Sequence, residues 1–185
     1  MNRFFPTITI TAFIFSTKAA QACFMAAALN INDVSYADVV VVGSIENYEI
    51  IRDMAFRERM LSNPNLSEEL RELYSDPDQS LIGDYARFEV LVSESLVGDV
   101  PQRFFATWDN STFGEPASLA NEQRLMAFRQ AESPIPPLTG PSATILPNPE
   151  PQSLAILQAP CAPPFIFMNS SDVAQSIREI LVKGP

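Results

Sequence analysis

The sequence has 185 residues, of which 46% are hydrophobic and 18% charged, a composition typical of a globular protein of one domain. It contains no histidine and only two cysteines, so Ser-His-Asp and Cys-His catalytic arrangements and histidine-ligated metals are excluded. The formal net charge is −10, which disfavours nucleic acid and anionic membrane surfaces as partners.

The first residues, 1–22, are typical of a signal peptide. Arg3 gives a positive start, residues 4–15 are mostly apolar, and Ala20-Gln21-Ala22 fits a small-x-small cleavage site. The sequence therefore predicts an exported protein, periplasmic or secreted, whose mature chain begins at Cys23.

Export also changes the charge and the relation to the membrane. Loss of Arg3 and Lys18 with the signal peptide leaves 10 basic against 22 acidic residues, a net charge of −12. We expect no membrane span, because the apolar run is shorter than the roughly 20 residues that cross a bilayer. A lipid anchor on Cys23 is the alternative, although Ala20 replaces the aliphatic residue that lipidation requires.

The first predicted strand is the valine-rich run within residues 32–51, after a helical turn that Asp33 is expected to cap. Gly43 interrupts this run where a bent or bulged strand needs no side chain.

The second predicted strand, Asp84–Val97, shows a two-residue alternation. One face carries Phe88, Val90 and Val92, and the other carries Arg87, Glu89 and Leu91. This pattern indicates an antiparallel strand that is buried on one face. Gln102–Trp108 and Arg124–Arg129 are the third and fourth predicted strands.

Residues 52–83 between the first two strands are predicted to form a helical insertion. Asn65 and Glu68 fit a capping box, and Asp76-Pro77-Asp78 ends the helical pattern. An apolar stripe packed on the domain is favoured over a partner-binding helix; its residues are Leu66, Leu70, Leu73 and Tyr74.

Residues 131–164 contain ten prolines and only two charged residues, Glu132 and Glu150, so an extended segment is expected. Within it, Ser153–Gln158 is predicted to be a short fifth strand that delivers Cys161 to the core. A terminal helix over 172–182 follows, capped by Ser170 or Ser171; its apolar face is Val173, Ile177, Ile180 and Leu181.

Several weak motifs occur in a suggestive order: a cysteine after the signal peptide, Ala37–Gly43, Arg87–Val90 with Leu96–Gly98, Arg124–Phe128, and a cysteine before the terminal helix. This order resembles the netrin-like family, which includes the tissue inhibitors of metalloproteinases, and more closely its small exported bacterial relatives. The resemblance covers most of residues 23–182, read as a single domain. It implies a mainly β fold, a five-stranded OB-like closed barrel with a helical insertion and a C-terminal α-helix, tied by disulfides.

The chain departs from this family pattern at its cysteines. Cys23-Phe24-Met25 stands where such domains open Cys-x-Cys, and residues 118–122 lack a further cysteine and a Phe-x-x-Gly turn. In an oxidising compartment the two cysteines most simply form a Cys23–Cys161 disulfide, worth about 4 to 5 kcal/mol at most; free or intermolecular thiols are the alternative.

The predicted function is a non-enzymatic protein-interaction module, with Cys23, Phe24 and Met25 as binding residues, no cofactor and no metal. The protein partner is unknown. A lipid-anchored structural protein of the envelope is the alternative. The resemblance also implies a metalloprotease inhibitor, in which the α-amine and carbonyl of Cys23 would meet the zinc of a bound protease.

An enzyme, such as a carboxylate-dependent glycan hydrolase, would need paired acids. Three pairs are available: Asp76 with Asp78, Glu46 with Glu49, and Asp109 with Glu115. None has diagnostic spacing, so solvated loop acids are the favoured interpretation. Trp108 is read as core or rim packing rather than a sugar-stacking ring.

Overall fold

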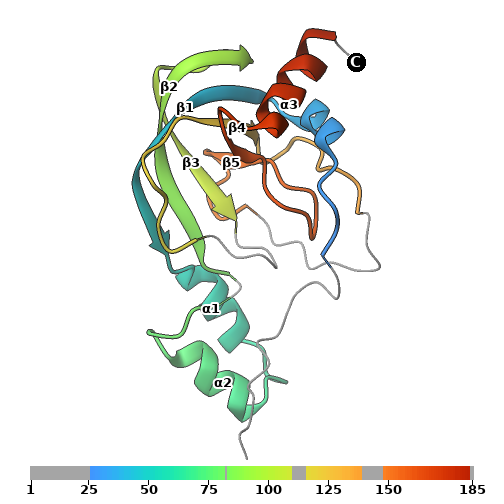
Figure 1. The fold of residues 1–185 in the computed structure, drawn as a ribbon. Coiled ribbons are helices and arrows are strands. Elements are labelled where there is room, and N and C mark those ends of the chain that lie inside the picture. The colour runs from blue at the N-terminus through green and yellow to red at the C-terminus, as the bar shows by residue number, and fades with distance from the viewer. Residues whose placement is uncertain (1–25, 82, 110–115, 139–147, 184–185) are drawn as a thin grey trace, which may run out of the picture.

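The computed structural model describes residues 26–81, 83–109, 116–138 and 148–183. Its centre is a closed barrel of five strands, with the order β1-β2-β3-β5-β4 and a pairing of β4 back onto β1 (Figure 1). These strands are β1 (Val39–Ile51), β2 (Tyr85–Val97), β3 (Arg103–Asp109), β4 (Arg124–Arg129) and β5 (Leu154–Ile156). The predicted mainly β class and OB-like closed barrel are therefore confirmed.

The pairing within the barrel is antiparallel except between β3 and β5, which run parallel. A short strand, β6 (Ile166–Met168), shares one edge of β4 with β5. It was not predicted, because three residues that closely follow two prolines carry no alternation to detect.

Gly43 is the point at which β1 bends. The β1–β2 register shifts between Val42 and Gly43, and β1 pairs with β4 only up to this residue. A Cβ atom at Gly43 would lie 2.3 Å from the carbonyl oxygen of Leu91, so β2 approaches too closely for any side chain. The predicted bulge at Gly43 is confirmed.

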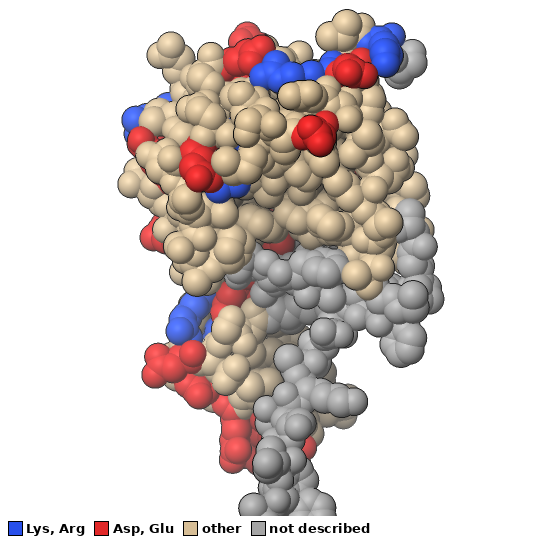
Figure 2. All heavy atoms as spheres, in the orientation of Figure 1, with Lys and Arg blue, Asp and Glu red and all other residues tan. Residues whose placement is uncertain are grey.

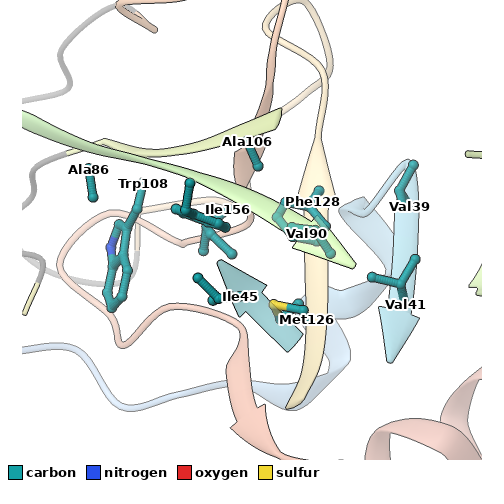
Figure 3. Close-up of a cluster of buried hydrophobic side chains, with 11 residues drawn as sticks. Val39, Val41, Ile45, Ala86, Val90, Ala106, Trp108, Met126, Phe128 and Ile156 are labelled. Atoms are coloured by element: carbon teal, nitrogen blue, oxygen red, sulfur yellow. The ribbon is translucent and has the colours of Figure 1, made fainter. Parts of the chain in front are cut away.

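The barrel interior is filled by apolar side chains from all five strands (Figure 3). They are Val39, Val41, Ile45, Ala86, Phe88, Val90, Ala106, Trp108, Met126, Phe128 and Ile156. The rings of Phe104 and Phe128 meet edge to face with centroids 5.3 Å apart. Trp108 thus belongs to the core, as expected.

A second apolar cluster lies on the outer face of β1 and β4, beneath η1 (Ile31–Tyr36) and α3 (Asp172–Lys183). It includes Val40, Val42, Leu125, Ala127, Ala174 and Ile177. Both strands are therefore buried on two faces, which explains the uninterrupted valine run.

The structure corrects two of the predicted helix-capping residues and identifies which serine caps the terminal helix. Asn30, rather than Asp33, caps η1 and accepts a hydrogen bond from the amide of Asn32. Ser67, rather than Asn65, caps the second insertion helix. The hydroxyl of Ser171 accepts from the amide of Ala174 at 3.2 Å, so Ser171 caps α3.

The predicted insertion is a helical hairpin, defined here as residues 52–84, that projects from one end of the barrel (Figure 1). It contains α1 (Met54–Leu61) and α2 (Glu68–Ser75). The stripe on α2 was predicted to pack on the domain. Instead α2 packs on α1, where Tyr74 contacts Phe56, and no residue of α2 is buried.

A buried ion pair fixes the hairpin to the start of β2. Arg57 and Asp84 lie 3.1 Å apart, and both side chains are 2% exposed. Arg57 also donates to the carbonyls of Asp76 and Gln79, while Asp84 accepts from the amides of Asp53 and Leu81. These hydrogen bonds satisfy the terminal nitrogens of Arg57 and the carboxylate of Asp84, while Arg57 Nε is buried without a partner.

Replacing Gly43 by alanine tests the close approach of β1 and β2. We expect Gly43→Ala to lower the free energy of unfolding by about 1 to 3 kcal/mol, because the new methyl group must push Leu91 away. Urea unfolding would measure the loss, with Ser44→Ala as the neighbouring control. Equal midpoints for both variants would contradict the assignment.

Replacing Asp84 by asparagine tests the buried ion pair. Asp84→Asn leaves the charge of Arg57 buried, so we expect a loss of about 3 to 5 kcal/mol in urea unfolding. The matched control is Glu94→Gln, which breaks the more exposed 2.7 Å pair with Arg178 and should cost below about 1 kcal/mol. Similar losses for the two variants would show that the Arg57 pair is not structurally decisive.

Candidate functional site

The predicted binding residues are Cys23, Phe24 and Met25, which follow the predicted signal peptide. Residues 1–25 lie outside the described residues. They include these three residues, and therefore one of the two cysteines of the predicted Cys23–Cys161 disulfide. Four residues after Cys23, the amide of Ala27 donates to the carbonyl of Cys161 at 2.9 Å. The N-terminal part of the described chain therefore runs beside Cys161.

Cys161 itself is held rigidly. Its side chain is buried, its φ of 67° lies in the left-handed region, and it is not a free cysteine. The segment after β5 brings it to the core, as predicted from Ser153–Gln158. A non-glycine residue in this conformation is held there by its surroundings.

A second candidate site, which we call the Glu150 cluster, lies on the outer face of β2 and β3 and consists of Tyr85, Arg87, Thr107, Asp109 and Glu150. Tyr85 and Arg87 point outward because they alternate with the buried Ala86 and Phe88. The Tyr85 hydroxyl donates to Glu150 Oε1 at 2.8 Å, and Arg87 Nε donates to the same oxygen at 2.7 Å. Glu150 thereby ties the proline-rich segment to the barrel.

The β3 side of this cluster contains unpartnered polar atoms. Thr107 lies opposite Arg87, and Asp109 lies opposite Tyr85. Within the described part of the chain, Thr107 Oγ1, Asp109 Oδ1 and Asn148 Nδ2 are buried without a hydrogen-bond partner. Such atoms are uncommon in folded proteins, and their concentration beside Glu150 marks the cluster as chemically distinct.

The two carboxyl groups of the cluster have pKa values shifted in opposite directions. Burial, with a smaller contribution from Glu150, raises the pKa of Asp109 to about 6; the Thr107 hydroxyl and Arg129 partly offset it. Burial also raises the pKa of Glu150, but the hydrogen bonds from Arg87 and Tyr85 outweigh it and hold that pKa below its ordinary value. The surroundings therefore favour the protonated form of Asp109 and the ionised form of Glu150.

Tyr85 completes the electrostatics of the cluster. Burial and the hydrogen bond to Glu150 raise the pKa of Tyr85 to about 12, so its hydroxyl remains a donor at neutral pH. A neutral acid beside an ionised one can exchange a proton or switch a hydrogen bond with pH. Thr107 is 0% exposed, so the face beneath Glu150 is covered rather than open.

Among the acids considered as pairs from the sequence, Glu46, Glu49 and Asp76 have ion-pair or hydrogen-bond partners. Glu46 and Glu49 on β1 form ion pairs with Arg103 and Arg87, each at 3.6 Å. Asp76 accepts a hydrogen bond from the amide of Asp78, which closes a turn after α2. Glu115, the proposed partner of Asp109, lies outside the described residues.

Glu89 lies on the same face of β2 as Arg87, as its alternation predicts, but it is buried. Asn47 and Arg103 both donate to its Oε2 at 2.8 Å. Asn47 has a φ of 50° at the third irregularity of β1, between Glu46 and Glu49, and its amide donates to Glu89.

The described residues contain no group of three acids or cysteines placed to hold a metal ion. None of the described helices is long and apolar enough to span a membrane.

Replacing Asp109 by asparagine tests the pKa shift. Because the folded state binds the Asp109 proton more tightly than the unfolded state, stability should fall as pH rises from about 4 to about 6. Asp109→Asn should therefore raise the free energy of unfolding by about 1 to 3 kcal/mol at pH 7 and change it little below pH 4. Urea unfolding at both pH values would measure this, with the exposed Asp99→Asn as control; a destabilised Asp109→Asn at pH 7 would refute it.

No protein-family model, curated protein or solved structure matches this chain. The fold class rests on the strand order of the barrel. The netrin-like resemblance rests on the sequence motifs alone.

Proposed function

We propose that the chain is an exported, non-enzymatic protein-interaction module of netrin-like type that binds a protein partner through Cys23, Phe24 and Met25. The observation that carries the proposal is the 2.9 Å hydrogen bond from Ala27 to Cys161. It brings the beginning of the described chain to Cys161, which is buried.

A disulfide between Cys23 and Cys161 would explain this arrangement. Two bridged cysteines have Cα atoms about 4.4 to 6.8 Å apart, and the four-residue step from Cys23 to Ala27 allows that approach. Cys161 is buried and conformationally fixed, so the bridge would hold the first residues of the mature chain in one place. A binding segment fixed in advance loses less conformational entropy when a partner binds.

The architecture supports the same proposal. In five-stranded OB-type barrels, loops at the barrel surface bind ligands and partners while the strands stay rigid. Here a barrel with a doubly buried β1 provides that rigid base, and α3 secures its outer face. The netrin-like motif order adds the expectation that the N-terminal segment is the part that binds.

Intact-mass measurement of the protein purified from its native envelope tests export and the disulfide together. We expect a chain that begins at Cys23, with an unmodified α-amine and a mass two hydrogens below that of the reduced form. Cys161→Ser should lower the melting temperature, and reducing agent should lower that of the wild type alone. A diacylglycerol adduct on Cys23 would favour the lipid-anchored envelope protein, and an intact residue 1–22 segment would overturn export.

Partner binding is tested by co-purification from the same envelope. The wild-type chain and a Val182→Ala control, changed at an exposed position on α3, should retain the same protein. The double variant Phe24→Ala, Met25→Ala should lose it, because the segment that carries these residues would form the contact. Identical retention by all three chains would refute this role for the N-terminal segment.

A further inference from the structure

The helical hairpin exposes an apolar stripe that the rest of the described chain leaves open. Leu70 is 43% exposed and Leu73 is 37% exposed, although both have large apolar side chains. The neighbouring side of α2 is occupied: Tyr74 meets Phe56 with ring centroids 6.0 Å apart, and Arg71 donates to the Leu61 carbonyl at 3.1 Å. The stripe is thus bordered by α1 on one side and open on the other.

The open border of the stripe is acidic. Leu70 and Leu73 are three residues apart and share one face of α2, and Glu69 lies next to Leu73 on the side away from Tyr74. Residues 52–84 contain eight acidic and four basic residues, a net charge of −4. Figure 2 shows acidic side chains along the lower part of the molecule, where the hairpin lies in Figure 1.

The acids of the hairpin differ from those of the barrel in their pairing. On the barrel, salt bridges engage Glu46, Glu49, Glu89, Glu94, Glu122 and Glu150. Among the described residues, no salt bridge engages the hairpin acids Glu58, Glu68, Glu69 and Glu72. The hairpin therefore keeps its negative field available beside an exposed leucine stripe.

The arginines of the hairpin make local contacts, although Arg52 and Arg59 are exposed to solvent. Arg57 is buried against Asp84, and Arg59 lies over the Phe56 ring at 5.7 Å. Arg52 donates to the Asp78 carbonyl, and Arg71 donates to α1. Each of the four arginines has a partner inside the hairpin itself.

We propose that the Leu70–Leu73 stripe docks a basic amphipathic helix of a partner protein. Leucines on the partner would pack on Leu70 and Leu73, and its lysines or arginines would flank Glu69 and lie in the field of the other hairpin acids. A second copy of this chain does not fit, because two hairpins of net charge −4 would repel each other. This proposal rests on residues of the hairpin and does not depend on the proposed binding role of Cys23, Phe24 and Met25.

Fluorescence anisotropy with a synthetic probe tests this docking surface. The probe is a labelled 14-residue peptide of leucine and lysine whose leucines recur at helical spacing, added to the full mature chain at 0.15 M salt. The control peptide has the same composition with its leucines scattered around the helix. We expect the patterned peptide to bind at least tenfold more tightly than the scattered one.

Variants of the protein localise the binding. Leu70→Ser with Leu73→Ser should weaken binding at least tenfold, and Glu69→Gln should weaken it about threefold, as expected for one exposed charge pair. The matched control on the barrel is Met168→Ser, at a residue 38% exposed, together with Glu122→Gln. Both control variants should bind the patterned peptide as the wild type does.

The outcomes separate this inference from folding effects and from the proposed function. Circular dichroism and melting temperature report whether the leucine variant folds, and Glu69→Gln decides the question if it does not. Equal binding by Glu69→Gln and wild type, equal binding of both peptides, or a dimer that the leucine changes abolish would overturn the proposal. Phe24→Ala with Met25→Ala should leave peptide binding unchanged, so failure of the N-terminal site and of this surface are distinguishable.

Discussion

The barrel depends on the close approach of β1 to β2 at Gly43, where a Cβ atom would lie 2.3 Å from the Leu91 carbonyl. Before this point β1 pairs with β4, and beyond it β1 continues along β2 alone. One bent strand thus belongs to both sides of the closed sheet. The filled interior, the cover of η1 and α3, and the outward placement of Tyr85 and Arg87 all follow from that closure.

The chemistry of the molecule lies mainly in the segments between the strands. Most glutamates on the barrel strands are paired with arginines, whereas Asp109 Oδ1 on β3 is buried without a partner. The proline-rich segment contributes Glu150, and the β1–β2 connection contributes the helical hairpin. A rigid sheet with specialised connections is a common division of work in binding proteins, because loops vary without disturbing the core.

Much of the fold could be predicted because strands alternate and the interior is apolar. Arg124–Arg129 was predicted to the residue, and Gly43 was correctly read as a bend. The Arg87–Glu150 contact joins residues 63 positions apart, and no local pattern encodes such a pairing. The helical periodicity identified the apolar face of α2. It did not show that this face stays exposed, because what packs on a helix face depends on tertiary structure. Asn30 and Ser67 replaced the expected caps because several nearby polar residues can fill that position.

The parallel pairing of β3 with β5 sets an order on folding. β3 ends at Asp109, and β5, which pairs with it, begins only at Leu154, after β4 along the chain. Contacts so distant along the chain form slowly, because closing the intervening loop costs conformational entropy. Until Leu154–Ile156 has been synthesised, one edge of β3 has no neighbouring strand, so the sheet of a nascent chain is open and not yet closed into a barrel.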